Sequence, residues 1–219
     1  MKKIAISFIN RKGGVGKTTL AIIFAQTALS AGLKVAAVDL DSQKNFTDAM
    51  SLVQERYGNN LHITDKITED GDVIILDCPP ALCNATDQAF SFSDITLIPV
   101  RPDMFSLSNI DVVYNNGKAH GKAFQQMAIV KVGFTNKIKG LSGITTMALS
   151  LREYAIAGDI AINGLIPFNI ASGRIWSASI TVPTRMPYLN MYQRVINAYN
   201  MMLDGNYINA WEDNTNAKT

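Results

Sequence analysis

The clearest chemistry in the sequence lies in a glycine-rich segment with two lysines, Lys-Gly-Gly-Val-Gly-Lys-Thr-Thr.

 This segment spans Lys12 to Thr19. Glycines in such a segment let backbone N–H groups close around phosphate oxygens. Lys17 can reach the β- and γ-phosphates of a nucleotide, and Thr18 offers a hydroxyl to Mg²⁺. The segment predicts a nucleotide-phosphate loop, whose contacts we assign to Lys12, Gly13, Gly14, Val15, Gly16, Lys17, Thr18 and Thr19.

The loop departs from the strict spacing of a glycine, four residues and Gly-Lys-Thr, because Arg11 occupies the first glycine position. Lys12 instead stands early in the loop, on its rim. A lysine there cannot easily serve the phosphates from inside the loop, but it can reach a nucleotide held by a second subunit. The alternative is a solvated surface charge.

Three aspartates follow two of the apolar runs. Asp39 and Asp41 lie at the end of the apolar run that begins at Val35. Alternation of side chains places both on the same side at the carboxyl edge of a parallel sheet. Asp77 ends the second run, Ile-Ile-Leu, and Pro79 and Pro80 fix the exit of the chain. We expect Asp77 to bind Mg²⁺ through water. A helix N-cap role for Asp41 or Ser42 is the alternative.

The elements that must position these residues follow from alternating apolar and amphipathic runs. Continuous Val- and Ile-rich runs are typical of parallel strands covered on both faces. Strand–helix–strand repetition predicts an α/β fold with a doubly wound, mostly parallel sheet flanked by helices. We expect strands at 4–9, 35–40, 73–76, 95–100, 127–134 and 160–166, and helices at 17–31, 85–91, 107–120, 143–158 and 188–203. Residues 171–187 are expected to form a loop region that could include a helical turn. We expect one domain over 1–203 and a polar, fraying tail over 204–219.

Composition limits the class of protein. The formal net charge of +2 does not by itself indicate a nucleic-acid partner. Two cysteines, Cys78 and Cys83, are too few for a disulfide scaffold and have no neighbouring His to complete a metal site. The apolar run after Met1 is too short for a signal peptide, and no run of about 18 apolar residues predicts a membrane span. We therefore expect a cytoplasmic protein.

With Lys12 early in the loop, the chain resembles the ParA/MinD family of deviant Walker A ATPases, which have a P-loop NTPase fold. The resemblance covers about the first 170 residues. It implies that Lys12 contacts the partner's ATP in a nucleotide-sandwich dimer and that Lys12, Lys17 and Asp41 are the catalytic residues. Asp41 would orient the attacking water, while Thr18, Asp39 and Asp77 would support Mg²⁺. Ser42 replaces the proline of the family's Asp-x-Asp-Pro-Gln motif.

Later landmarks extend the resemblance. The run 97–102 is similar to the family's strand exit at the dimer face, where Arg101 lines that face or is a plain surface residue. Asn136 is the candidate for adenine recognition, with turn capping as the alternative. Pro167 and Asn169 are weaker adenine candidates.

The resemblance is to short ParA-type partition proteins without an N-terminal helix-turn-helix, and it implies an output. We expect ATP-dependent homodimerisation, DNA binding without sequence preference at the nucleoid, and weak ATP hydrolysis stimulated by a ParB-like centromere-binding partner. The DNA could meet a basic stripe formed by Lys137, Lys139, Arg152, Arg174, Arg185 and Arg194, or these could be scattered solvated charges.

Other outputs of the same fold are alternatives. A MinD-like positioning ATPase would bind membrane, but the tail after Asp204 is acidic with little periodicity, which argues against an anchor. A positioning ATPase for a protein cargo stays open. A metabolic synthetase would have no use for Lys12, and an iron–sulfur carrier would need a differently placed cysteine pair.

Overall fold

A seven-stranded parallel sheet forms the centre of the computed structural model, which describes residues 2–133, 151, 154–160 and 182–212. The strands lie in the order β3-β2-β4-β1-β5-β6-β7, and every neighbouring pair is parallel. Their bounds are β1 Ile4–Phe8, β2 Val35–Asp39, β3 Leu61–Thr64, β4 Val73–Asp77, β5 Ile95–Val100, β6 Met127–Val132 and β7 Ile156–Ile160. The expected α/β, doubly wound P-loop fold is confirmed.

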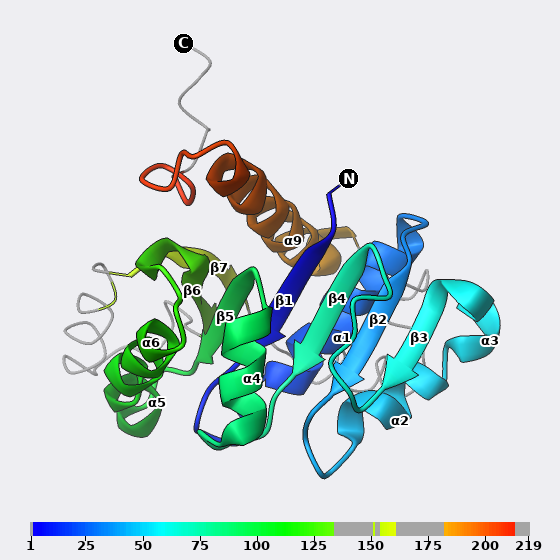
Figure 1. Cartoon of the computed structure of the whole chain (residues 1–219), viewed down its shortest axis with the longest axis horizontal. Coiled ribbons are helices and arrows are strands. Elements are labelled where there is room, and N and C mark those ends of the chain that lie inside the picture. Colours follow the sequence, from blue (N-terminus) through cyan, green and yellow to red (C-terminus); the bar gives the residue numbers. More distant parts are fainter. Residues whose placement is uncertain (1, 134–150, 152–153, 161–181, 213–219) are drawn as a thin grey trace.

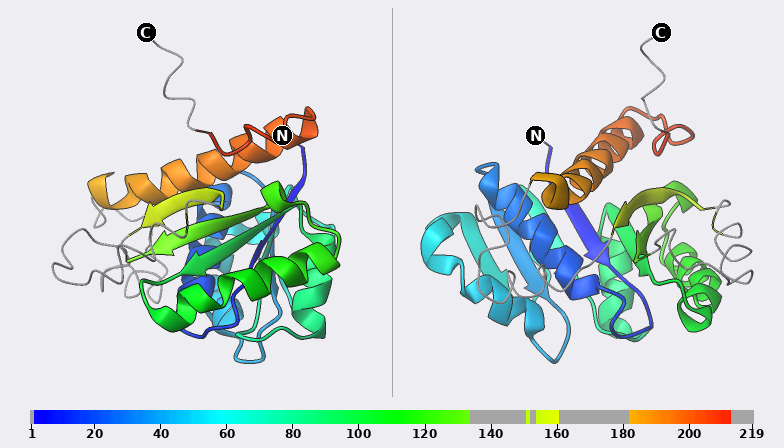
Figure 2. Two further views of the ribbon diagram at one scale, coloured as in Figure 1. Left: turned by 90° about the vertical axis from the view of Figure 1, so that its left-hand side faces the viewer. Right: turned by 180° about the vertical axis from the view of Figure 1, so that it is seen from behind.

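Helices cover both faces of the sheet (Figures 1 and 2). One face carries α1, α2 and α9, and the other carries α4 and α6, with α5 beside α6. The described helices are α1 Lys17–Ser30, α2 Asn45–Ser51, α3 Gln54–Tyr57, α4 Asn84–Phe92, α5 Met104–Ser108, α6 Ile110–Ala119 and α9 Val182–Leu203, with short 3-10 turns at Gly58–Asn60 and Phe124–Gln126.

Two apolar cores follow from the alternation of side chains along the strands. In β1, Ile4, Ile6 and Phe8 pack into the core on the side of α1 and α9, while Ala5 packs into the opposite core with Phe90 of α4. Phe8 meets Phe24 edge to face at 5.2 Å between ring centroids. Because both faces of the central strands are buried, the carboxyl ends of these strands are held in place. The residues that follow each strand are held with them.

Several expected boundaries are wrong. Strand β7 spans Ile156–Ile160, so the expected helix over 143–158 cannot include residues 156–158. Of the strand expected at 160–166, only Ile160 lies among the described residues. The expected helix over 107–120 is two helices, α5 and α6, separated at Asn109. The short elements β3, α2 and α3 were not expected. Most of 143–153 and all of 161–181 lie outside the described residues.

The C-terminal segment also differs from expectation. Helix α9 begins at Val182 and contains Pro187, although residues 171–187 were expected to be a loop. The fraying expected from Asp204 does not begin there, because Ala210 and Trp211 are buried in the core on the α9 side. The indole Nε1 of Trp211 donates to the Gln125 carbonyl at 2.7 Å. This bond ties the chain after α9 to the turn before β6.

Candidate nucleotide site

The carboxyl ends of three adjacent strands bring the candidate site together. β4 lies between β2 and β1, and Asp77 pairs in register with Asp39 of β2 and with Phe8 of β1. The phosphate loop follows β1 directly. The two strand-end aspartates and the loop therefore meet at one edge of the sheet, as expected for ligand sites in open parallel sheets.

Asn10 anchors the loop to the sheet. Its side chain is 1% exposed, and its Nδ2 donates to the Pro99 carbonyl of β5 at 2.7 Å. Its Oδ1 accepts from the backbone N–H of Lys12 at 2.9 Å. A single buried amide thus fixes where the loop leaves β1 and where Lys12 starts.

Two glycines give the loop its shape. Gly14 and Gly16 have φ angles of 71° and 104°, which L side chains rarely adopt. Gly16 is the N-cap of α1 and lends no side chain to the free N–H groups there, and the first turn of α1 has no acidic residue. The N–H groups and the helix dipole are therefore left to an anion, which is the arrangement that binds phosphate.

Lys17 and Asp77 are both buried behind the loop. Lys17 is 6% exposed and donates from Nζ to the Lys12 carbonyl at 3.1 Å. Burial lowers the pKa of the Lys17 ammonium, and the negative charge of Asp77 offsets part of that shift. A buried cation next to free helix N–H groups gives the loop a strong preference for a multiply charged anion.

Asp77 is the most perturbed carboxyl at this edge. It is 1% exposed, and neither of its side-chain oxygens has a hydrogen-bond partner among the described residues. Burial raises its pKa to about 7; the Thr18 hydroxyl lowers it in part, although no hydrogen bond of normal geometry forms. Buried polar groups normally have partners, so an unsatisfied carboxylate beside a hydroxyl suits a hydrated cation.

The donor set fits Mg²⁺ carried in with a nucleotide. Within the described residues no cluster of three or more His, Cys, Asp or Glu side chains could hold a metal alone. Mg²⁺ in phosphate-loop proteins needs few protein ligands, because waters and phosphate oxygens complete its octahedron. Thr18 and Asp77 are the side chains suited to that task here.

Asp39 organises the loop after β2. Its side chain is fully buried; Oδ1 accepts from the N–H of Asp41 at 3.1 Å, and Oδ2 accepts from the N–H of Thr47 in the first turn of α2 at 2.8 Å. Asp41 is half-buried and accepts from the N–H of Gln43. The N-cap residue of α2 is Lys44, which makes no side-chain cap bond, and Asp39 accepts from the first turn instead, so the N-cap alternative for Asp41 is not what the structure shows.

Lys12 is paired within its own chain. Its Nζ lies 2.5 Å from Oδ1 of Asp103, and both side chains are about one-third exposed, at 34% and 35%. Asp103 also accepts from the N–H of Ser106 and so caps α5. Burial raises the pKa of Asp103, but hydrogen bonds from Lys12 and Ser106 outweigh this and hold the pKa below its usual value. Phe105, 75% exposed, places its ring 6.0 Å from the Lys12 ammonium.

Two arginines flank the same rim. Arg101 reaches the carbonyl of Gly14 at 3.4 Å, and Arg11 reaches Oδ1 of Asn109 at 3.3 Å. Arg101 is exposed, so its guanidinium is both a loop contact and a surface charge. The rim around Lys12 thus combines three cations, one carboxylate and an exposed aromatic ring.

Other expected site residues cannot be placed in this way. Asn136, Pro167 and Asn169 lie outside the described residues, as do Lys137, Lys139, Arg152 and Arg174. Arg194 is described, and its guanidinium donates to the carbonyl of Trp211. It is part of the packing of the C-terminal segment.

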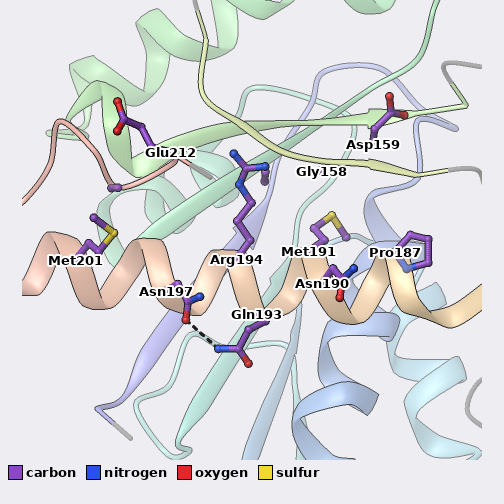
Figure 3. A pocket seen from close by; sticks show the side chains of 12 residues that line it. Gly158, Asp159, Pro187, Asn190, Met191, Gln193, Arg194, Asn197, Met201 and Glu212 are labelled. Carbon is purple, nitrogen blue, oxygen red and sulfur yellow. Dashed lines mark hydrogen bonds between the residues drawn. The ribbon is translucent and has the colours of Figure 1, made fainter. Parts of the chain in front are cut away.

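A groove lined by described residues lies elsewhere. It measures about 570 Å³ and runs between β7, α9 and the segment through Glu212 (Figure 3). Arg194, Asp159 and Glu212 line it together with amides of α9, among which Gln193 donates to Asn197 at 2.9 Å. No residue of the phosphate loop lines this groove.

Sequence reasoning missed Asn10, Asp103 and Lys44. Asn10 carried no local signal, because its bond to Pro99 joins positions 89 residues apart. Asp103 carried a local signal, because an aspartate three residues before Ser106 is typical of a helix N-cap. Lys44, whose Nζ donates to the Asp39 carbonyl at 2.9 Å, carried none, since this contact depends on the backbone conformation after β2.

Comparison with known proteins agrees with this geometry. A family model described as "AAA domain" matches residues 1–64 and 60–128. The chromosome-partitioning ATPase Soj of Thermus thermophilus is 26% identical over 143 residues, which cover 48% of this chain and 57% of that protein. The chain therefore spans less than two thirds of the length of this relative.

Solved structures share the fold. A putative plasmid partition protein from Borrelia burgdorferi bound to AMPPNP has a TM-score of 0.69 at 20% identity, covering 88% of this chain and 98% of that one. A chain of the MinC:MinD cell division protein complex of Aquifex aeolicus has a TM-score of 0.70 at 18% identity, covering 88% of this chain and 95% of that one.

The fold and the loop define a P-loop protein of the deviant Walker A class. The chain belongs to the AAA-domain family matched above and, within it, to the ParA/MinD group. Within the described part of the chain, no helix has the length and apolar character needed to cross a membrane.

Proposed function

We propose that this chain is a ParA-type, Mg²⁺-dependent ATPase for plasmid or chromosome partitioning. It binds ATP, forms a homodimer around two nucleotides, and binds DNA without sequence preference in that state. Slow hydrolysis, stimulated by a ParB-like partner, returns it to the monomer. This cycle places it in the cytoplasm, in association with the nucleoid.

The different environments of two lysines in one loop carry the proposal. Lys17 is buried at 6% exposure and faces the phosphate position, whereas the side chain of Lys12 is 34% exposed on the rim. An ordinary phosphate loop needs only the buried lysine. The rim lysine is suited to a nucleotide outside its own protomer, which is the role that the ParA/MinD resemblance implies.

Each polar residue at the edge has a task in this function. Lys17 and the free N–H groups of α1 bind the phosphates, and Asp41 orients the attacking water. Asp39 fixes the backbone that carries Asp41 and supports the hydrated metal. Bound Mg²⁺, held by Thr18 and Asp77, would neutralise developing charge on the phosphates. Adenine contacts are assigned to Asn136, Pro167 and Asn169.

The names of related proteins support partitioning as the output. The Thermus relative is a chromosome-partitioning ATPase, and one structural neighbour is a plasmid partition protein. MinD, a cell division protein, is a neighbour of equal similarity. Membrane binding and positioning of a protein cargo are therefore outcomes that the test must separate from DNA binding.

Co-sedimentation with DNA tests the proposal, run with ATP, ADP and no nucleotide beside liposomes. We expect DNA retention only with ATP, with a steep loss as salt rises, because phosphate contacts release counterions. Lys17→Ala, which removes the buried phosphate-binding charge, should lose ATP-dependent retention. Equal DNA binding without nucleotide would contradict the switch, and retention on liposomes alone would favour the MinD-like alternative.

A further inference from the structure

A tight turn after β2 carries Asp41. The N–H of Lys44 donates to the Asp41 carbonyl at 3.1 Å and closes the four-residue turn 41–44. Within it, the N–H of Gln43 donates to Oδ1 of Asp41 at 3.0 Å. The orientation of the Asp41 carboxylate therefore depends on whether this turn is held.

Lys44 has an unusual backbone conformation. Its φ is 56°, and it is the one non-glycine residue with a positive φ in the described part of the chain. The left-handed region is unfavourable for a side chain with a Cβ, and glycine is the default there. Such residues persist where the surroundings hold them, often at functional sites.

The side chain of Lys44 supplies such a hold. Its Nζ donates to the carbonyl of Asp39 at 2.9 Å. Asp39 lies one residue beyond the last β2–β3 pair, Val38 with Thr64, so this carbonyl stands past the end of β3. The ammonium also lies 3.9 Å from Asp65, an exposed ion pair that adds little. The side chain of Lys44 thus connects the end of the turn to the end of β2, and Asp41 lies between these two points in the sequence.

Ser42 occupies the second position of this turn. The ParA/MinD motif has proline there, which fixes φ at the second position of a turn. Ser42 leaves that φ free. The side chain of Lys44 and the carboxylate of Asp39, which accepts from Asp41 and Thr47, hold the same turn from outside.

We propose that Lys44 is a positioning residue, which holds Asp41 in place for hydrolysis in compensation for Ser42. The inference rests on the proposed function for the role of Asp41. The bond from Lys44 Nζ to the Asp39 carbonyl, which we call the Lys44 tether, acts through the backbone and need not touch the nucleotide.

Amide hydrogen exchange over residues 41–47 in the nucleotide-free protein tests the tether without reference to activity. Lys44→Met keeps the length of the side chain and removes the charge, and Lys66→Met makes the same change on an exposed lysine after β3. We expect Lys44→Met to speed exchange in this segment about tenfold, the size of one lost charge-assisted hydrogen bond. Exchange as slow as in Lys66→Met would overturn the tether.

ATP turnover tests the positioning role. Lys44→Met should lower kcat about tenfold and leave KM unchanged, because the tether holds Asp41 and not the substrate. Adding Ser42→Pro to Lys44→Met should restore both slow exchange and kcat. A raised KM, or no recovery with proline, would overturn the positioning role.

A replacement variant and the activity of the wild-type protein separate failure of the tether from other causes. If Lys44→Met unfolds, Lys44→Gly, which relieves the positive φ, replaces it under the same expectations. If the wild-type protein hydrolyses no ATP, the proposed function fails, while the exchange experiment still decides whether the tether exists.

Discussion

The ion pair between Lys12 and Asp103 makes a quantitative prediction about dimerisation. If Lys12 must contact the partner's nucleotide, it must first leave Asp103, and both protomers of a dimer bear that cost. Both side chains are about one-third exposed, so each pair stabilises the monomer by about 0.5–1 kcal/mol. Removing both pairs therefore favours the dimer by about 1–2 kcal/mol, a fall of about 5- to 30-fold in the dimer dissociation constant.

Asp103→Asn isolates this effect, because asparagine keeps an oxygen that can accept from Ser106 and caps helices as well as aspartate does. Asp204→Asn, at an exposed position beyond α9, is the matched control. Sedimentation velocity across a concentration series with an ATP analogue measures the dissociation constant. A dimer as weak as wild type or weaker would refute the reasoning, since Asp103 would then not compete with the interface for Lys12.

Three further outcomes follow from the site and the fold. Asp41→Ala should lower ATP turnover about a hundredfold and leave an ATP-bound dimer that persists in light scattering; unchanged turnover would remove Asp41 from the site. In the nucleotide-free protein, the raised pKa of Asp77, about 7, means that the folded state keeps a proton that the unfolded state loses near its ordinary pKa of 3.8. Stability should therefore fall as pH rises from about 4 to about 7, and urea unfolding of Asp77→Asn should show a weaker fall; equal pH dependence would contradict the assignment. Gly117→Ala should destabilise the fold by about 1–2 kcal/mol in urea unfolding despite a better helix propensity, because its Cβ would lie 2.4 Å from Sδ of Met127; a gain in stability would show that the core yields there.

The central strands could be predicted from the sequence because burial on both faces produces continuous apolar runs. The edge strand β3 could not, since it is four residues long and its His62 is exposed. β7, Ile-Ala-Gly-Asp-Ile, includes a glycine and an exposed aspartate, so the apolar run after it was the stronger strand pattern. The tertiary environment decided these elements against local preference.

Some residues of the candidate site could likewise be predicted from the sequence, and others could not. The glycines, Lys17 and the strand-end aspartates could be predicted because their spacing along the chain is the signal. The pairing of Lys12 with Asp103 joins residues 91 positions apart, and Asn10 bonds Pro99 across 89 positions. Such contacts depend on β1 lying beside β5, which a local pattern does not encode.

The most direct measurement of the central claim is the ATP-dependent assembly of Lys12→Ala beside wild type. Nucleotide titration should show ATP binding close to wild type, because the buried Lys17 and the loop N–H groups are intact. Sedimentation velocity with ATP should show a monomer, since the partner's nucleotide has lost its rim lysine. A dimer of normal strength would contradict the account and leave only an ordinary nucleotide pocket.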